Sequence, residues 1–254
     1  MTKSIRSVLS YVLRATLARF NRTLVASNAH WISENYIFNR IAKLSPDMVL
    51  DIGANEGQFA IKLRESGYRG HIISFEPQVN VFNKLKIKVN QDEKWECHQL
   101  ALGDTNESLS MHVSMFSQSS SLLPIGRLHT ELLPNSVEIG KETVTVVTLD
   151  AWGANRDLEK KRIFIKMDAQ GYERFILAGG KQTISSAVGA LVELCFAKIY
   201  DRQSKYYEVM EYLEGAGLSF AGLTEINSHP ASGDYLWADG LFIRPEHNIA
   251  ATQQ

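Results

Sequence analysis

The segment Val49-Leu50-Asp51-Ile52-Gly53-Ala54-Asn55-Glu56-Gly57-Gln58-Phe59 constrains the fold more than any other part of the chain. Its apolar beginning predicts a buried strand, its glycines a turn, and its end the start of a helix. Asn55 is expected to cap that helix, with Gln58 reaching back to the backbone. Gly53 and Gly57 are expected to let the backbone turn tightly and approach a ligand closely. In open α/β sheets, ligands bind in the crevice at the carboxyl ends of the strands.

The rest of the chain alternates short apolar runs with helical periods. This alternation predicts an α/β fold, a mostly parallel Rossmann-like sheet with helices on both faces. At 254 residues, the chain is long enough to bury one large core. Strands are predicted at residues 48–52, 71–75, 95–102, 163–168, 190–196 and 240–244, and helices at about residues 56–66, 78–90, 171–178 and 205–215.

One region departs from this alternation. Residues 108–115 alternate polar and apolar side chains, and residues 141–149 do so less regularly. Such alternation is typical of half-exposed strands, so we expect an antiparallel β-hairpin inserted after the third strand. The polar stretch Ser117-Gln118-Ser119-Ser120-Ser121 between them fits either an arch over a site or a solvated loop, and both interpretations stay open.

Residues 1–33 form a basic segment. They carry five basic residues and no acidic one, a local charge of +5, whereas the remainder has 22 basic against 28 acidic residues. Apolar residues recur every three or four positions, as in an amphipathic helix, and Arg14 interrupts the longest apolar run, so neither a signal peptide nor a membrane span fits. Peripheral contact of residues 1–25 with an anionic membrane and docking on the domain or a second subunit both stay open, docking being the commoner use. We expect an amphipathic basic helical arm at residues 1–45, one globular domain at 46–246 and a C-terminal tail at 247–254.

Charge and cysteine usage limit the partners and the compartment. The formal net charge of −1 gives no reason to expect nucleic acid as a partner. Cys97 and Cys195 lie among apolar neighbours in predicted strands, so free thiols in a reducing cytoplasm explain them best. We therefore expect a cytoplasmic protein, whose contact with the inner membrane surface depends on the arm. Neither a Cys-x-x-Cys nor a His-x-x-x-His spacing occurs, and no metal site is predicted.

The acid Asp51 decides which nucleoside ligand the glycine turn suits. A dinucleotide places a doubly negative pyrophosphate at such a turn, and a carboxylate two residues before the first glycine would repel it. S-adenosylmethionine carries no phosphate, and an acid favours its ammonium and sulfonium groups. Asn55 also stands where the fingerprint Gly-x-Gly-x-x-Gly has its second glycine. The turn therefore predicts S-adenosylmethionine as cofactor, and a buried Asp51 that only satisfies turn amides is the structural alternative.

Two further strand ends complete the predicted cofactor site. Glu76 closes the second strand, where a carboxylate is placed to accept both ribose hydroxyls, and Pro77 is expected to fix the first turn of the next helix. Ala101 and Leu102, at the end of the third strand, are expected to lie along the adenine. The predicted cofactor-binding residues are Asp51, Gly53, Ala54, Asn55, Gly57, Glu76, Pro77, Ala101, Leu102 and Asp168.

A second strand, turn and helix, at residues 164–173, carries the predicted chemistry. Asp168 ends a strand expected beside the first one, so it would face the switch point where a methyl donor meets its acceptor. Glu173, on the first turn of the following helix, either shares the site or simply favours a helix N-terminus. Glu193 is an acid inside an apolar strand, where burial is costly without a partner. We predict Asp168 as the base or acceptor-orienting residue, assisted by Glu173 or Glu193.

These segments together resemble the FkbM family of methyltransferases. The resemblance implies a class I methyltransferase fold for residues 46–246, S-adenosylmethionine as donor, and usually O-methylation of hydroxyls on sugars, glycolipids or polyketide-like products. Many relatives have Glu where this chain has Gln170, which weakens any assignment of position 170 as the base. The matching pieces are Asp51-Ile52-Gly53-Ala54-Asn55-Glu56-Gly57, Phe75-Glu76-Pro77, Ala101-Leu102-Gly103-Asp104, Ser119-Ser120-Ser121, Thr148-Leu149-Asp150, Lys166-Met167-Asp168-Ala169-Gln170-Gly171-Tyr172-Glu173, Val192-Glu193 and Asp239-Gly240-Leu241-Phe242.

The predicted function is S-adenosylmethionine-dependent methylation of a small-molecule or glycan acceptor, at a hydroxyl of a sugar, glycolipid or secondary metabolite. Two alternatives from other classes stay open. One is a methyltransferase-like nucleoside-binding module without catalysis, against which the acids at positions 51, 76 and 168 argue. The other is an NAD-dependent oxidoreductase or epimerase, weakened by Asp51 and the missing middle glycine.

Overall fold

The computed structural model describes residues 34–247. The predictions for residues 1–33, including membrane contact of residues 1–25, and for residues 248–254 lie outside this range. The described part of the predicted arm is the helix α2 (Glu34–Leu44). The boundary between the two units into which the chain divides lies inside this helix, between Ile37 and Phe38. The domain bounds 1–45, 46–246 and 247–254 remain predictions. Within the described residues, no helix has the length and apolar character needed to cross a membrane.

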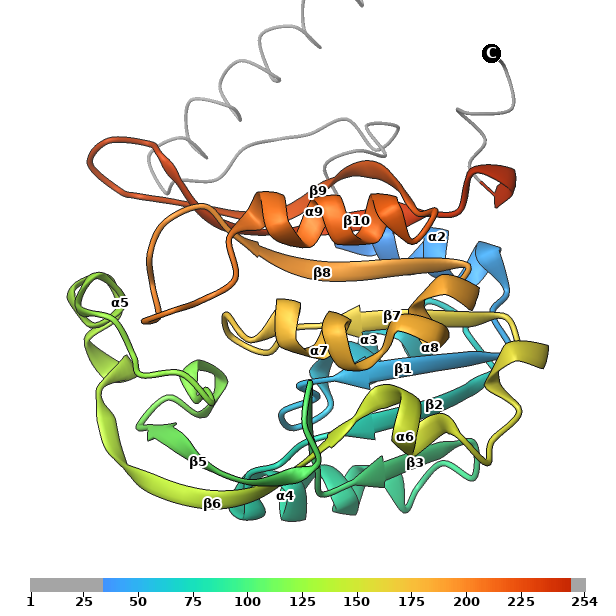
Figure 1. The fold of residues 1–254 in the computed structure, drawn as a ribbon, viewed down its shortest axis with the longest axis horizontal. Coiled ribbons are helices and arrows are strands. Elements are labelled where there is room, and N and C mark those ends of the chain that lie inside the picture. Colours follow the sequence, from blue (N-terminus) through green and yellow to red (C-terminus); the bar gives the residue numbers. More distant parts are fainter. Residues whose placement is uncertain (1–33, 248–254) are drawn as a thin grey trace, which may run out of the picture. The chain divides into compact units, whose positions relative to one another are not determined.

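A seven-stranded sheet forms the centre of the domain (Figure 1). The neighbouring strands β3, β2, β1, β7 and β8 pair in parallel, and β10 runs antiparallel to both β8 and β9. This arrangement confirms the predicted mostly parallel α/β fold. In spatial order the strands are β3 (Trp95–His98), β2 (His71–Phe75), β1 (Met48–Ile52), β7 (Ile163–Met167), β8 (Gly189–Cys195), β10 (Tyr235–Ile243) and β9 (Ser219–Ser228).

Helices cover both faces of this sheet, with α7, α8 and α9 on one face and α3 on the other (Figure 1). In α4, for example, Val81, Leu85 and Val89 are buried at helical spacing. The remaining α-helices are α3 (Gln58–Glu65), α4 (Val79–Val89), α5 (Arg127–Leu132), α6 (Leu149–Gly153), α7 (Glu173–Gly179), α8 (Lys181–Ser186) and α9 (Tyr206–Gly215). Short 3₁₀ turns lie at η1 (Ser117–Ser119), η2 (Pro134–Ser136), η3 (Leu158–Lys160) and η4 (Pro245–His247).

The prediction of one strand over residues 95–102 was wrong. β3 ends at His98, and β4 (Ala101–Gly103) belongs to a second sheet of three strands, in the order β4-β6-β5. Ala101 packs there against Met111, Val144 and Val146. Only Gln99 and Leu100 separate the two strands, and neither is a glycine or proline that would mark the break in the sequence.

The predicted insertion is confirmed as an antiparallel pair, although its strands belong to this second sheet. β5 (Glu107–Ser114) and β6 (Glu138–Thr148) pair over nearly their whole length, with Leu109 opposite Val144. β9 was missed because most of its side chains are half-buried or exposed, so its apolar pattern is weak. β10 begins five residues before the predicted strand, and this first part is mostly apolar, with Asp239 as its one acid.

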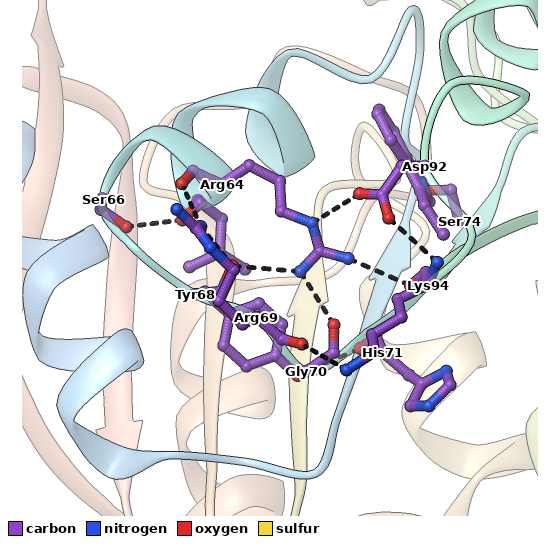
Figure 2. Close-up of polar contacts among 11 residues, drawn as sticks. Arg64, Ser66, Tyr68, Arg69, Gly70, His71, Ser74, Asp92 and Lys94 are labelled. Carbon is purple, nitrogen blue, oxygen red and sulfur yellow. Dashed lines mark hydrogen bonds and ion pairs between the residues drawn. The ribbon is translucent and has the colours of Figure 1, made fainter.

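Arg64, near the end of α3, binds the loops that lead into the amino ends of two parallel strands (Figure 2). Its Nε donates to Asp92 Oδ2 at 2.7 Å, and its terminal nitrogens donate to the carbonyls of Gly70 at 2.8 Å and Lys94 at 3.0 Å. These bonds tie the loops before β2 and β3 together. The network satisfies backbone groups at the amino ends of the strands, so we assign it a structural role.

Candidate functional site

The switch point of the sheet lies between β1 and β7. From β1 the chain goes on to β2 and β3 on one side, and from β7 it goes on to β8 on the other. The turns that follow β1 and β7 therefore meet at the carboxyl edge, the usual ligand-binding position in such sheets. The N–H of Asp168 donates to the carbonyl of Ile52 at 3.1 Å, which joins the two turns directly.

The first turn needs its glycines for packing as well as for conformation. Gly53 has φ of +72° and Gly57 has φ of +85°, both in the left-handed region. A Cβ on Gly53 would overlap the carbonyl oxygen of Asp168, and one on Gly57 would lie 2.8 Å from the Trp95 ring. The close approach at Gly53 is therefore to the neighbouring strand, and an approach to a ligand remains a prediction.

The prediction that Asn55 caps the following helix was wrong. Helix α3 begins only at Gln58, and its N-cap residue is Gly57, which makes no side-chain cap. Asn55 itself is left-handed, with φ of +46°, and lies in a turn that the hydrogen bond from the N–H of Gly57 to the carbonyl of Ala54 closes at 2.8 Å. Its Oδ1 accepts a hydrogen bond from Gln58 Nε2 at 3.2 Å, and its Nδ2 donates to Ser117 Oγ at 3.1 Å. Ala54, beside it, is buried.

Asp51 lies beneath the turn, fully buried and paired with Lys166. The Lys166 Nζ is 3.3 Å from Asp51 Oδ1 and donates to the carbonyl of Gly53 at 2.8 Å. Burial raises the pKa of Asp51 while Lys166 opposes the shift. Burial lowers the pKa of Lys166, but Asp51, Asp168 and Asp239 raise it more. The Asp51 carboxylate thus faces an internal cation. Any effect of Asp51 on the cofactor would therefore be indirect, through the conformation of the turn.

The sequence analysis did not single out Lys166 as a site residue. The available signal was a lysine inside the otherwise apolar strand β7, where all five side chains are buried. A buried ammonium needs a carboxylate partner. Asp51 lies opposite it in the neighbouring strand. Without knowledge of that strand order, the partner could not be named.

Glu76 connects the end of β2 to the first turn. Its Oε2 accepts from the N–H of Asn55 at 3.0 Å and its Oε1 from the N–H of Gln78 at 2.8 Å. Burial raises the pKa of Glu76 to about 7. Each carboxylate oxygen keeps a lone pair that a ribose hydroxyl could use. The prediction that Pro77 fixes the first turn of the next helix was wrong. That helix, α4, begins at Val79 and has Gln78 as its N-cap residue, so Pro77 lies before it.

Ala101 and Leu102 lie in β4 rather than at the end of the third strand of the main sheet. Their side chains are buried in the packing of the domain. An adenine would therefore meet the backbone of this segment or the residues just before it. Their contact with the cofactor remains a prediction.

In the second turn, Gln170 joins two of the predicted acids. Its Nε2 donates to Asp168 Oδ1 at 2.7 Å and lies 3.3 and 3.2 Å from the two carboxylate oxygens of Glu193. The hydroxyl of Tyr200 donates to Gln170 Oε1 at 2.6 Å, which fixes the orientation of the amide. Gln170 is left-handed, with φ of +54°. The structure therefore brings Asp168 and Glu193 together through a neutral donor, where a glutamate would add a third carboxylate.

The three predicted catalytic acids differ in access. The side chain of Asp168 is 38% exposed, and its Oδ2 is 3.9 Å from Lys166 Nζ. Glu193 is buried, and its pKa is raised by burial and by Asp168. Glu173 is buried beneath the turn, where its Oε1 accepts from the N–H groups of Ala169 and Gly171. Burial raises the pKa of Glu173 to about 7. Its contacts favour the structural alternative, so Asp168 is the acid open to a substrate.

The segment between β5 and β6 spans both turns. Ser121 Oγ donates to the carbonyl of Gln170 at 2.8 Å, and Ser117 Oγ accepts from Asn55. The hydroxyl oxygen of Tyr200 also lies 3.1 Å from the carbonyl oxygen of Ser119. The interpretation as a solvated loop was wrong, because Ser119, Ser120 and Ser121 are all buried. The serines instead form an arch that links the turn after β1 to the turn after β7.

The chemistry of these side chains suits a cationic ligand. The switch point carries carboxylates, amides and hydroxyls, and its lysine is already paired with Asp51. Carboxylates in such surroundings favour a sulfonium and an ammonium over a pyrophosphate. The residues present therefore fit S-adenosylmethionine.

Within residues 34–247, no group of three or more His, Cys, Asp or Glu residues has an arrangement that could hold a metal ion. Cys97 and Cys195 are both free.

Comparison with known proteins places the chain in a family. Residues 51–220 match the methyltransferase FkbM domain. The chain is 23% identical over 175 residues to the 2-O-methyltransferase NoeI of Sinorhizobium fredii, which covers 66% of this chain and 72% of that protein. It resembles the crystal structure of the methyltransferase FkbM from Methylobacillus flagellatus with a TM-score of 0.50 and 16% identity, over 78% of this chain and 44% of that one. This likeness supports the expected class I methyltransferase-like fold.

A weaker likeness extends over nearly all of another chain. Magnesium protoporphyrin IX methyltransferase from Synechocystis, solved with bound S-adenosylmethionine, matches with a TM-score of 0.43 and 11% identity, over 94% of this chain and 96% of that one. The chain thus spans less than half of the Methylobacillus structure and nearly all of the Synechocystis one.

Proposed function

The chain belongs to the FkbM family of S-adenosylmethionine-dependent methyltransferases, and from this premise we propose that it methylates a hydroxyl of a sugar, glycolipid or secondary-metabolite acceptor. The observation that carries the proposal is the exposed carboxylate of Asp168, held by Gln170 at the switch point. A neutral hydroxyl needs a group that removes or shares its proton, which a carboxylate provides. The name of the relative NoeI, a 2-O-methyltransferase, supports an oxygen acceptor.

The donor would be held by the first turn and by Glu76. When bound, S-adenosylmethionine supplies a methyl group on a sulfonium. The backbone of the turn at Gly53 and Ala54 would face the amino-acid part of the donor, and Glu76 would accept from the ribose hydroxyls. Because both Glu76 oxygens already accept backbone N–H groups, the carboxylate is fixed before the ligand arrives.

The acceptor hydroxyl would lie against Asp168. Much of the rate of an in-line displacement comes from holding the reacting atoms close together and aligned. Gln170, itself fixed by Tyr200, limits the positions that the Asp168 carboxylate can take. The same amide binds Glu193, so Glu193 would assist through Gln170. The two alternatives, a non-catalytic module and an NAD-dependent enzyme, gain no support from the family match.

Donor binding tests the cofactor half of this proposal. Replacing Glu76 by alanine should weaken the binding of S-adenosylhomocysteine roughly 10–100-fold, because charge-assisted hydrogen bonds to the ribose are lost. Isothermal titration calorimetry measures the effect. The matched control is Glu211→Ala on the exposed side of α9, which should leave the affinity unchanged. Unchanged affinity in Glu76→Ala, or binding of NADH alone by the wild type, would contradict the assignment.

Transfer of a tritiated methyl group tests the acceptor half. The enzyme is incubated with labelled S-adenosylmethionine and a panel of methyl glycosides of hexoses and 6-deoxyhexoses, with aminosugars of the same ring as competitors. Label that resists acid hydrolysis of the glycosidic bond and stays on the sugar as a methyl ether of one of its hydroxyls supports O-methylation of a sugar. Label found only on nitrogen, or only on acceptors without a sugar ring, would reject the sugar proposal.

A further inference from the structure

Asp239 lies beside the predicted catalytic acids, although it is 46 positions beyond Glu193 in the sequence. In the sheet, Asp239 of β10 is directly opposite Glu193 of β8. β7 lies on the other side of β8, with Met167 opposite Val192, so Asp168 follows one step beyond this pair. Directly opposite residues in paired strands share one face. The three acids therefore follow one another across the carboxyl edge of one face.

Their hydrogen-bond partners differ. Asp168 and Glu193 both accept from Gln170. In the part of the chain that the structure describes, the side chain of Asp239 has neither a hydrogen bond nor an ion pair, and it is only half-buried. Even a half-buried carboxylate loses part of its hydration and is normally paired with a donor, because leaving it without one costs free energy. Asp239 is therefore an acid whose oxygens are free for a ligand.

The charges around Asp239 make this position still less favourable for a structural acid. Asp168 after β7, Glu193 on β8, Glu225 on β9 and Glu173 on α7 are all acidic, and Lys166 is the cation that opposes them. The charge of Glu225 is partly balanced by Lys62 of α3 at 4.0 Å. Burial, followed by Asp168, raises the pKa of Asp239 to about 8. An acid with a pKa near the working pH is well suited to accept a proton in catalysis.

We propose that Asp239 is the general base that takes the proton from the acceptor hydroxyl, and that Asp168 orients the same hydroxyl. The inference rests on the proposed O-methylation and assigns a residue that the sequence analysis did not include in the site. As the acceptor oxygen forms its bond to the methyl carbon, the carbon–sulfur bond breaks and its electron pair stays on sulfur. The hydroxyl proton passes to an Asp239 oxygen and then to water, which restores the carboxylate.

A test without any acceptor follows from the same surroundings. The folded state holds the proton of Asp239 to about pH 8, whereas the unfolded chain releases it near pH 4. Between these values the folded state binds more protons, so the contribution of Asp239 to stability falls as the pH rises. Asp239→Asn removes this loss. The variant should therefore melt at a higher temperature than the wild type, and the difference should grow from pH 5 to about pH 8 and level off above it.

The control for this test is Asp104→Asn, at an exposed position in the loop after β4, whose melting temperature should match the wild type at every pH. Melting is followed by circular dichroism. A lower melting temperature for Asp239→Asn, or a difference that does not grow with pH, would mean that Asp239 serves the fold, and the inference would be wrong. This outcome does not depend on whether the acceptor has been found.

Methyl transfer to the best glycoside of the panel gives the second readout. The wild-type kcat/KM should rise with pH with a midpoint near pH 8 and level off above it, as the base loses its proton. Asp239→Asn should lower kcat at least 100-fold and remove this dependence, whereas Asp168→Asn should lower kcat and keep it. Full activity of Asp239→Asn would overturn the inference while leaving the proposed function intact. If no glycoside is methylated, the proposed acceptor fails and the melting series alone decides about Asp239.

Discussion

Asp168→Asn is expected to lower kcat by about 10² to 10⁴-fold while the protein stays folded. The carboxylate is the most accessible of the predicted catalytic acids, with 38% of its side chain exposed. Asparagine keeps the shape, and its Oδ1 can still accept the bond from Gln170, so the turn should keep its conformation. What is lost is the charge that we propose orients the acceptor hydroxyl. The measurement is tritium transfer at saturating donor concentration.

Asp104→Asn serves as the matched control for this loss, since it removes the same charge at an exposed position away from the switch point. The affinity for S-adenosylhomocysteine should change less than tenfold in Asp168→Asn, because we propose that the first turn and Glu76 hold the donor. An Asp168→Asn protein with wild-type kcat would remove Asp168 from the acceptor site.

Gly53→Ala is expected to cost more than about 4 kcal/mol of unfolding free energy, a large part of the stability of a typical domain. Two effects add at this position. The residue has φ of +72°, which a side chain opposes, and the new Cβ would overlap the backbone oxygen of Asp168. Because that oxygen belongs to the neighbouring chain segment, relief requires β1 and β7 to move apart. Urea unfolding followed by circular dichroism measures the change.

Gly67→Ala separates the two effects. Gly67 also has a positive φ, of +97°, but a Cβ there would have no atom within 4 Å. It should therefore show only the conformational cost, about 1–2 kcal/mol. If Gly53→Ala cost no more than Gly67→Ala, the contact between the two turns would be looser than the structure has it. In that case only the close approach of a ligand would explain why position 53 is a glycine.

The individual elements of the fold were largely predictable. β1 and β2 have the predicted bounds, and α4 and α9 begin and end within one residue of the prediction. These elements are set by apolar periodicity and by glycines at their ends, which act over a few residues. The exceptions have local causes. β9 lacks a clear pattern, and the strand predicted at residues 95–102 joins two strands of different sheets.

The candidate site was predictable only in part. Asp168 was expected because it ends a strand at the switch point, and Glu193 because an acid inside an apolar strand is costly without a partner. Glu173 was expected as well, but the structure gives it contacts with the turn. Nothing in the sequence around Tyr200 indicates that its hydroxyl reaches Gln170, 30 positions away. The match to Asp239-Gly240-Leu241-Phe242 marked the position of Asp239 without giving it a role.

The sequence by itself determined the kind of fold, the position of the switch point and the acidic character of the site. Local rules suffice for these, because a strand, a glycine turn and a helix are each specified by neighbouring residues. Only the tertiary structure decided that Asp51 faces Lys166, that Ser117 bonds to Asn55 across 62 positions, and that Asp239 lies opposite Glu193. Each of these contacts depends on the order of the strands and on the path of the insertion. That order is fixed by the packing of the whole core, which no short segment contains.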